Sequence, residues 1–410
     1  MIASQPGPYF NYFIFMKKEL ILKILAGIMM FAVVTSAYGL DVRLGGRIQA
    51  EYSVIDIDGF SSQSSIDDPT FYSSFGLKAT ENLGNGFKAF ALVDYGFNLS
   101  GDIGAGRERY VGFSSDMLGE LKVGRVHSLF ADYIGGWTID PFTYTSLQAT
   151  GSGGTMIASA NGLGSGTYTA VNSVIRIESI TVNGFSFAGL LMPGDANSLE
   201  PNLGGVLGGG GNNAGNTGGA NGQWDFQVAA KYAFDYKNHN VDLFGGYSRD
   251  NVSSIQKSIS AVNLKSENVW RGGAVWSYKN FQIQGQYDYI SNALGTATCS
   301  DAAALGAVGE VTRRCNSAIN PGGDGSVWYT GGQYKLGNTT LIAQGGMTNA
   351  HSTGAFASRK AKSYTVGAFH HLSQRTSLFT GYQHVNVEDK NSTIDRDSNI
   401  WTAGIRHNFY

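Results

Sequence analysis

From residue 41 onward the chain alternates between apolar and polar side chains with a period of two, the pattern of a β-strand with two different faces. In the stretch 41–52, Val42, Leu44 and Ile48 share one face. The other face carries Asp41, Arg43, Gly45, Arg47, Gln49 and Glu51. Strands of soluble sheets are usually about 5 to 6 residues long, whereas membrane-spanning strands need about 9 to 11. Long strands with one apolar and one charged face favour a membrane barrel with a polar lumen.

Short turns and long polar connections follow each other in strict alternation. Short turns are predicted at 82–85, 116–119, 182–184, 237–239, 279–280, 336–338 and 372–375. Long connections are predicted at 55–69, 100–106, 127–170, 193–222, 251–265, 292–325, 350–360 and 388–397. Seven turns and eight long connections separate sixteen strands. The sequence therefore predicts an all-β, sixteen-stranded antiparallel transmembrane barrel with short periplasmic turns and long external loops, closed so that no strand edge is left exposed.

The first 39 residues have the features of an export signal. Basic residues precede an apolar stretch at 24–34, and Ala37-Tyr38-Gly39 forms a small-residue cleavage site. We expect the mature barrel to comprise residues 40–410, and Met16 is an alternative start because the residues before it carry no charge. A retained membrane anchor is disfavoured because a spanning helix needs about 20 apolar residues.

Composition excludes other classes of protein. Charged residues make up 15% of the chain, against about a quarter in soluble globular proteins. Removal of 1–39 leaves 26 basic and 30 acidic residues, because three lysines and Glu19 are lost. A mildly acidic chain of this kind is not expected to bind nucleic acid.

The two cysteines, Cys299 and Cys315, lie in a polar connection. Export to an oxidising compartment favours a disulfide between them. The alternative, a metal site, lacks further ligands nearby. We expect neither a metal nor a cofactor.

Catalysis is not expected either. Seven histidines are present, but the adjacent His370 and His371 must point to opposite faces of a strand. His384 and His407 have no serine or acid that the sequence places beside them. The chain is therefore predicted not to be an enzyme.

The connection 127–170 follows the fifth strand and begins with aromatic and apolar residues. Exposure of such residues would be costly, so we expect this third loop to fold into the barrel and narrow the lumen. Asp132 and Asp140 would then face the water path. Inward strand positions would supply a basic wall of Arg43, Arg47, Lys78, Arg107, Arg109 and Arg125. Opposed charges would filter solutes by size and sign, although each arginine could instead be a generic lumen or loop charge.

Several segments of the chain are similar to one family. These segments are 74–89, 107–113 with 118–125, 172–174, and 404–409. They resemble the general trimeric porins of Gram-negative outer membranes, particularly the neisserial and betaproteobacterial type, over essentially the whole mature chain. The segment 107–125 resembles the two strands that lead into that family's constriction loop.

The resemblance implies a homotrimer of water-filled channels for passive diffusion of small hydrophilic solutes and ions. It also implies contacts with outer-membrane lipid, lipopolysaccharide and the barrel assembly machinery, which reads the terminal aromatic, here Phe409 followed by an additional Tyr410. Ser74 and Val171 stand where the family often has arginine. The basic cluster is thinned, so ion selectivity does not carry over.

Two alternatives share the barrel fold. A substrate-selective channel would differ by saturable conductance. A structural or adhesin barrel would have a plugged lumen and carry no current.

Overall fold

The computed structural model describes most of residues 40–410. The described residues are 40–68, 72–97, 99, 103–151, 155–156, 170–193, 224–251, 265–292, 296–298, 316–318, 322–352, 359–389 and 396–409. The predicted signal segment 1–39, Cys299, Cys315 and Tyr410 lie outside them. Among the described residues no helix is long and apolar enough to cross a membrane.

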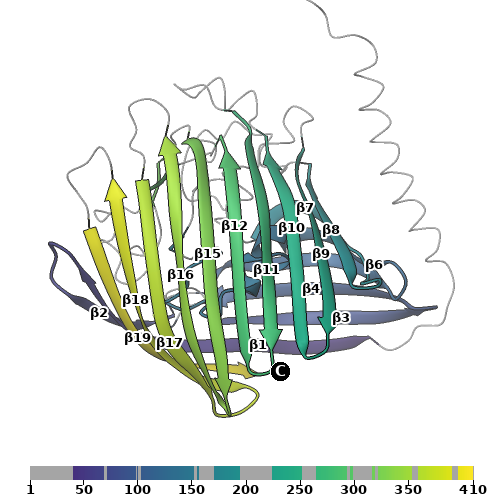
Figure 1. The fold of residues 1–410 in the computed structure, drawn as a ribbon. Coiled ribbons are helices and arrows are strands. Elements are labelled where there is room, and N and C mark those ends of the chain that lie inside the picture. Colours follow the sequence, from purple (N-terminus) through teal and green to yellow (C-terminus); the bar gives the residue numbers. More distant parts are fainter. Residues whose placement is uncertain are drawn as a thin grey trace, which may run out of the picture.

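Sixteen antiparallel strands form the barrel wall (Figure 1). They are β1 (Asp41–Ile57), β3 (Ser74–Gly84), β4 (Phe87–Phe97), β5 (Ile103–Ser115), β6 (Gly119–His127), β7 (Ala170–Glu178), β8 (Phe185–Met192), β9 (Asp225–Tyr236), β10 (His239–Asp250), β11 (Glu267–Tyr278), β12 (Phe281–Ser291), β15 (Gly322–Leu336), β16 (Thr339–Ser352), β17 (Arg359–His371), β18 (Thr376–Asp389) and β19 (Arg396–Phe409). The predicted fold class is confirmed.

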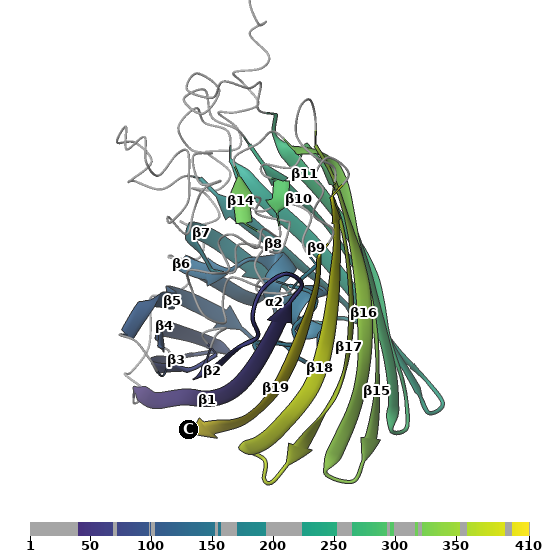
Figure 2. The same ribbon diagram turned by 90° about the vertical axis from the view of Figure 1, so that its left-hand side faces the viewer.

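Pairing of the first and last strands closes the barrel, as the two neighbouring ribbons in Figure 2 show. Their register runs from Gly46 opposite Phe409 to Ile57 opposite Ser398. On its other side β1 pairs with β3 through its first half and with β2 (Gln63–Asp67) through its second half. The strand β2 lies within the predicted connection 55–69, and a small hairpin of β13 (Thr296–Thr298) and β14 (Asn316–Ala318) lies within 292–325. These three short strands were not predicted.

The two faces of the wall are inverted relative to a soluble protein. Outward side chains are apolar and exposed, for example Val111 at 60% and Trp401 at 58%. Outward aromatics occur at both ends of the strands, with Trp270 near the long-connection end of β11 and Trp276 near its short turn. This is the expected surface of a lipid-facing barrel with interfacial aromatic residues.

The third long connection, residues 128–169 and called loop 3 below, enters the barrel. Its first part contains α2 (Leu129–Asp132) and the 3₁₀ helix η1 (Gly136–Thr138). Two apolar clusters join it to the inner wall. Phe130 and Ile134 pack with residues of β6 to β12, and Phe142 and Leu147 pack with residues of β16 to β19. Loop 3 therefore folds into the barrel, and this prediction is confirmed.

Candidate functional site

Wall glycines leave the space that the apolar side chains of loop 3 occupy. A Cβ on Gly367 would lie 2.8 Å from the ring of Phe142, and one on Gly381 would lie 2.6 Å from Leu147. Larger side chains at these two inward positions would therefore push loop 3 away from β17 and β18. In the sequence these glycines only interrupt the strand pattern, and nothing indicates that they make room for loop 3.

Five inward glutamines satisfy the backbone of loop 3. A buried loop must find partners for its amide and carbonyl groups, because unpaired buried polar groups are costly. The five bonds are Gln49 Nε2 to Tyr144 O at 2.8 Å, Leu129 N to Gln227 Oε1 at 2.7 Å, Gly136 N to Gln286 Oε1 at 2.8 Å, Gln344 Nε2 to Leu147 O at 3.2 Å and Gln383 Nε2 to Leu147 O at 2.9 Å. They come from β1, β9, β12, β16 and β18, so loop 3 is held from several sides.

A buried ion pair holds the first part of loop 3 against β11 and β12. Arg271 donates to the Asp288 carboxylate from Nε at 2.8 Å and from Nη2 at 2.7 Å. Its Nη1 donates to the carbonyl oxygens of Phe130 and Ile134, at the end of α2. Cations are favoured at a helix C-terminus, where carbonyl groups lack intrahelical partners. Arg271 is thus an anchor that the sequence reasoning missed.

On the opposite part of the wall, a buried carboxylate holds the middle of loop 3. Glu51 on β1 accepts from Ser146 N at 2.9 Å and from Thr402 Oγ1 at 2.7 Å. Ser53 lies beside it, with its Oγ 2.9 Å from that of Ser146. Loop 3 is therefore fixed both to β1 with β19 and to β11 with β12.

Of the two predicted loop acids, Asp140 does not face the water path. It is 3% exposed and accepts from the backbone amides of Phe142, Ala149 and Thr150 at 2.7 to 2.9 Å. Burial raises its pKa to about 6, although those amide hydrogen bonds oppose the rise. Asp140 therefore stabilises loop 3 from within, because its carboxylate accepts hydrogen bonds from three backbone amides of the same loop.

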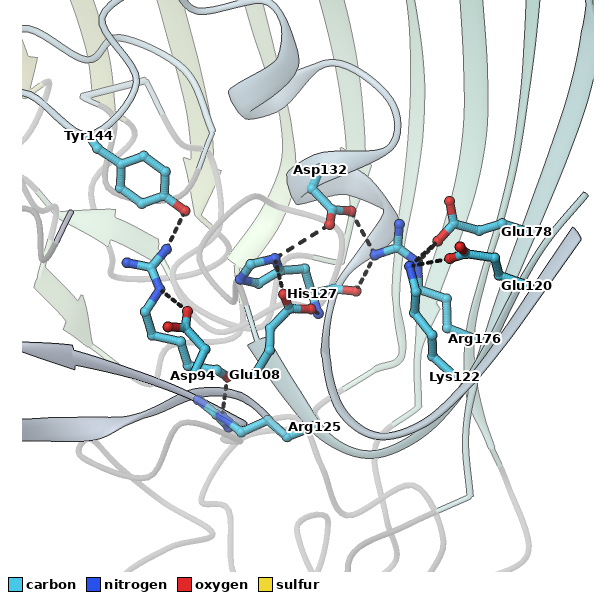
Figure 3. A network of polar contacts seen from close by, with 11 residues as sticks. Asp94, Glu108, Glu120, Lys122, Arg125, His127, Asp132, Tyr144, Arg176 and Glu178 are labelled. Carbon is cyan, nitrogen blue, oxygen red and sulfur yellow. Dashed lines mark hydrogen bonds and ion pairs between the residues drawn. The ribbon is translucent and has the colours of Figure 1, made fainter. Parts of the chain in front are cut away.

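Asp132 belongs to a charged network between loop 3 and the wall (Figure 3). Its carboxylate lies 2.7 Å from Arg176 Nη1 and 3.4 Å from His127 Nδ1. Burial alone would raise its pKa, but the His127 hydrogen bond and the Arg176 charge outweigh burial and lower the pKa to about 2. Glu178 bonds Lys122 and Arg176, each at 3.0 Å. Arg176 was not among the predicted wall cations, although it stands on β7 beyond Val171.

Arg47 and Arg107 lie in the lumen, and both contact a tyrosine of loop 3. Arg107 Nη2 donates to Tyr144 Oη at 2.7 Å, and its guanidinium carbon is 5.0 Å from the centre of the Tyr144 ring. The Arg47 guanidinium is 5.1 Å from the same ring and 4.6 Å from the Tyr72 ring. Arg406 stacks on the other side, 4.5 Å from Tyr72. We call Arg47, Tyr72, Arg107, Tyr144 and Arg406 the arginine–tyrosine ladder.

Arg43 and Lys78 also face inward, directly opposite each other on β1 and β3. Both are exposed, and Arg43 pairs with Asp41 at 2.8 Å. They lie toward the short-turn end of the barrel, away from loop 3. The structure therefore separates them from the ladder.

Arg109 and Arg125 lie on the outer face, not on the predicted basic wall. They oppose each other on β5 and β6, and Arg109 also opposes Val93, which is 40% exposed on the outer surface. Opposite residues of antiparallel strands share a face. A β-bulge accounts for Arg109, because Arg107 and Glu108 together stand opposite Asp94 and shift the alternation by one residue. Arg125 follows the exposed Val123 by two residues on β6 and shares its outward face.

Phe409 faces outward in phase with Trp401 and Ile405, as expected, and is 37% exposed. No group of three metal-ligating side chains is found among the described parts of the chain.

A closed sixteen-stranded barrel, apolar outside and crossed by a charged inward loop, defines an outer-membrane channel protein. Comparison with known proteins gives its family. A family model described as Gram-negative porin matches residues 25–391, so the chain belongs to that family. It is an outer-membrane porin for passive diffusion in Gram-negative bacteria, and not an enzyme.

Individual relatives agree. An outer membrane porin protein of Bordetella pertussis is 23% identical over 342 residues, which are 81% of this chain and 72% of the relative. Two solved structures have the same fold. The anion-selective porin from Comamonas acidovorans has a TM-score of 0.59 at 17% identity and covers 90% of this chain and 100% of its own. OmpF of Salmonella typhi has a TM-score of 0.61 at 14% identity and covers 91% and 100%.

A trimer form is present among the similar structures. It is OmpT of Vibrio cholerae, with a TM-score of 0.53 at 13% identity and coverage of 91% of this chain and 100% of its own.

Proposed function

We propose that the arginine–tyrosine ladder forms the selective part of the channel and that the channel prefers anions. Three guanidinium groups gather between loop 3, β1, β5 and β19, and Asp94, 3.4 Å from Arg107, is the carboxylate within ion-pair distance of them among the described residues. Arg47 and Arg406 donate to uncharged oxygens, those of Tyr72, Gln49 and Thr143. Arg406 also lies near the buried carboxylates of Glu51 and Asp68, whereas the charge of Arg47 acts on passing ions.

The carboxylates near α2 and β7 are largely neutralised by ion pairs with basic side chains. Asp132 and Glu178 are both bound by Arg176, and Glu178 and Glu120 are both bound by Lys122. Carboxylates held in ion pairs attract passing cations less than free ones. The gathering of three guanidinium groups at the ladder is the observation that carries the proposed anion preference, and the anion-selective structural neighbour supports it.

The test is the zero-current potential of the refolded mature protein in a planar bilayer under a potassium chloride gradient. We expect open channels whose potential has the sign of an anion-preferring pore. A cation-preferring sign contradicts the proposal. Stacked tyrosine rings and guanidinium groups also suit aromatic carboxylates, so a conductance that saturates with such a solute would favour a substrate-selective channel. Absence of current would favour a plugged structural barrel.

We infer that the chain assembles as a homotrimer through β3 and β4. Ala79 and Ala91 oppose each other there on the outer face, and small side chains permit close approach of another subunit. The trimer form of a structural neighbour supports this assembly. Migration of unheated, crosslinked protein as a trimer in detergent gels is expected, and migration as a monomer alone contradicts it.

A further inference from the structure

A tyrosine with a strained backbone stands at the centre of the arginine–tyrosine ladder. Tyr144 has a φ of +63°, and among the described non-glycine residues with a left-handed backbone it alone is aromatic. Bulky residues adopt this conformation only where the surrounding contacts impose it. Tyr144 N donates to Gln148 Oε1 at 2.8 Å, and Tyr144 O accepts from Gln49 Nε2 at 2.8 Å. Two hydrogen bonds thus hold this conformation, and strain of this kind is typical of ligand sites.

A second ring of loop 3 extends Tyr144 into an aromatic surface. The ring centres of Trp137 and Tyr144 are 4.7 Å apart, with an interplanar angle of 40°. Tyr72 continues the row 5.6 Å beyond Tyr144, and His127 continues it 5.2 Å beyond Trp137. Trp137 and Tyr144 are half-buried, so part of each side chain remains accessible. Inorganic ions do not need such a surface, whereas a planar aromatic solute can stack on it.

Arg47 presents an open guanidinium group beside this surface. Its Nε donates to Tyr72 O at 2.8 Å, and within the described part of the chain its two terminal nitrogens form no hydrogen bond or ion pair. The guanidinium carbon is 5.1 Å from the centre of the Tyr144 ring. Arg107, in contrast, is engaged by Asp94 and Tyr144. Two open terminal nitrogens match the two oxygens of a carboxylate.

We propose that Arg47, Tyr144 and Trp137 form a weak binding site for aromatic carboxylates, of which benzoate is the simplest. The carboxylate would bind the terminal nitrogens of Arg47, and the ring would stack on Tyr144 or Trp137. This inference rests on the proposed anion preference, because the same guanidinium groups draw anions to the ladder. It adds a preference among anions, since an aliphatic acid would be bound through Arg47 without stacking.

The experiment compares benzoate with cyclohexanecarboxylate, which has the same charge and nearly the same size but no aromatic ring. Each acid is added to the refolded mature protein in a planar bilayer in potassium chloride. The concentration that gives half of the maximal reduction in single-channel current is measured. We expect this concentration to be about fivefold lower for benzoate, because aromatic stacking strengthens its binding.

Three variants separate the contributions of the ring and of the charge. W137L should remove most of the fivefold difference, whereas W137F keeps a ring and should retain it. R47Q should weaken the binding of both acids about tenfold, because both lose the same charge-assisted hydrogen bonds. The matched control is W270L, which removes an exposed tryptophan from the outer face and should retain the difference.

Equal concentrations for the two acids in the unmodified protein overturn the inference, whether or not W137L folds. A difference that is undiminished in folded W137L, or unchanged binding in R47Q, also overturns it. The zero-current potential in potassium chloride tests the proposed function separately. A cation-preferring potential together with the benzoate difference supports this site and contradicts the anion preference. An anion-preferring potential with equal concentrations does the reverse.

Discussion

Arg107 and Arg109 are two residues apart on β5 but point to opposite sides of the barrel wall. Arg107 bonds Tyr144 inside the lumen, whereas Arg109 shares the outer face with Val93. In a regular strand both side chains would share one face. The extra residue opposite Asp94 separates them.

This relationship gives a matched test of selectivity. R107Q and R109Q remove the same charge from the same strand, but only R107Q removes it from the water path. A unit charge about 8 Å from an ion in a water-like medium is worth about 0.5 kcal/mol. Because that charge attracts an anion and repels a cation by the same amount, the anion-to-cation permeability ratio should fall about fivefold in R107Q and stay unchanged in R109Q. Equal zero-current potentials for the two variants would show that the arginine–tyrosine ladder does not determine ion selectivity.

The Asp132 network should weaken in acid. The pKa of Asp132 in the folded protein is about 2, below its usual value of about 4. The ionised carboxylate therefore stabilises loop 3 above about pH 4, and this contribution is lost as pH falls from about 4 to about 2. We expect single-channel current noise to rise over that window. D132N should be noisy already at neutral pH and vary little, whereas E120Q should behave like the unmodified protein. A noise profile in D132N that still follows pH would contradict this role.

The contribution of Asp140 to stability depends on pH in the opposite direction. Its pKa in the folded protein is raised to about 6, so the folded state binds the proton more tightly than the unfolded state. The stability gained from protonation is present below about pH 4 and is lost as pH rises through about 6. The free energy of unfolding in urea should therefore fall between pH 4 and pH 7 in the unmodified protein and change less in D140N. A steeper fall in D140N would show that Asp140 is not the titrating group.

The buried anchor should matter more than an exposed pair. Removing one partner of a buried pair costs about 3 to 5 kcal/mol, so R271L should lower the free energy of unfolding by about that amount and loosen loop 3. The control is K362Q, because Lys362 pairs with Glu388 where both side chains are about 40% exposed. Exposed pairs contribute little to stability, because solvent screens them. Comparable losses of unfolding free energy in R271L and K362Q would argue against Arg271 as an anchor of loop 3.

Alternation and turn spacing were sufficient to predict the barrel. The seven short turns, the strand count and the inward course of loop 3 all follow from local patterns, because lipid and lumen impose opposite polarities on successive residues. The same rule failed on β5, where a bulge adds one residue and reverses the faces beyond it, and Arg109 does not signal this in the sequence. On β6 the alternation itself places Arg125 with Leu121 and Val123 on the outer face, so the prediction of an inward Arg125 was wrong without a bulge.

The anchors of loop 3 could not be predicted for a different reason. Glu51, Gln286 and Arg271 read as ordinary polar residues of a water-filled lumen. Only the course of loop 3 shows that its backbone covers them. Asp140 was placed in the water path because sequence cannot tell an acid that faces solvent from one that accepts amide hydrogen bonds within its own loop.

A disulfide between β1 and loop 3 tests the central claim, that loop 3 lies fixed against β1 while the channel conducts. Ser53 and Ser146 have their Oγ atoms 2.9 Å apart, so S53C/S146C in a C299S/C315S background should form a bond on oxidation. We expect the same single-channel conductance before and after reduction. Failure of the bond to form, or conductance that appears only after reduction, would contradict it.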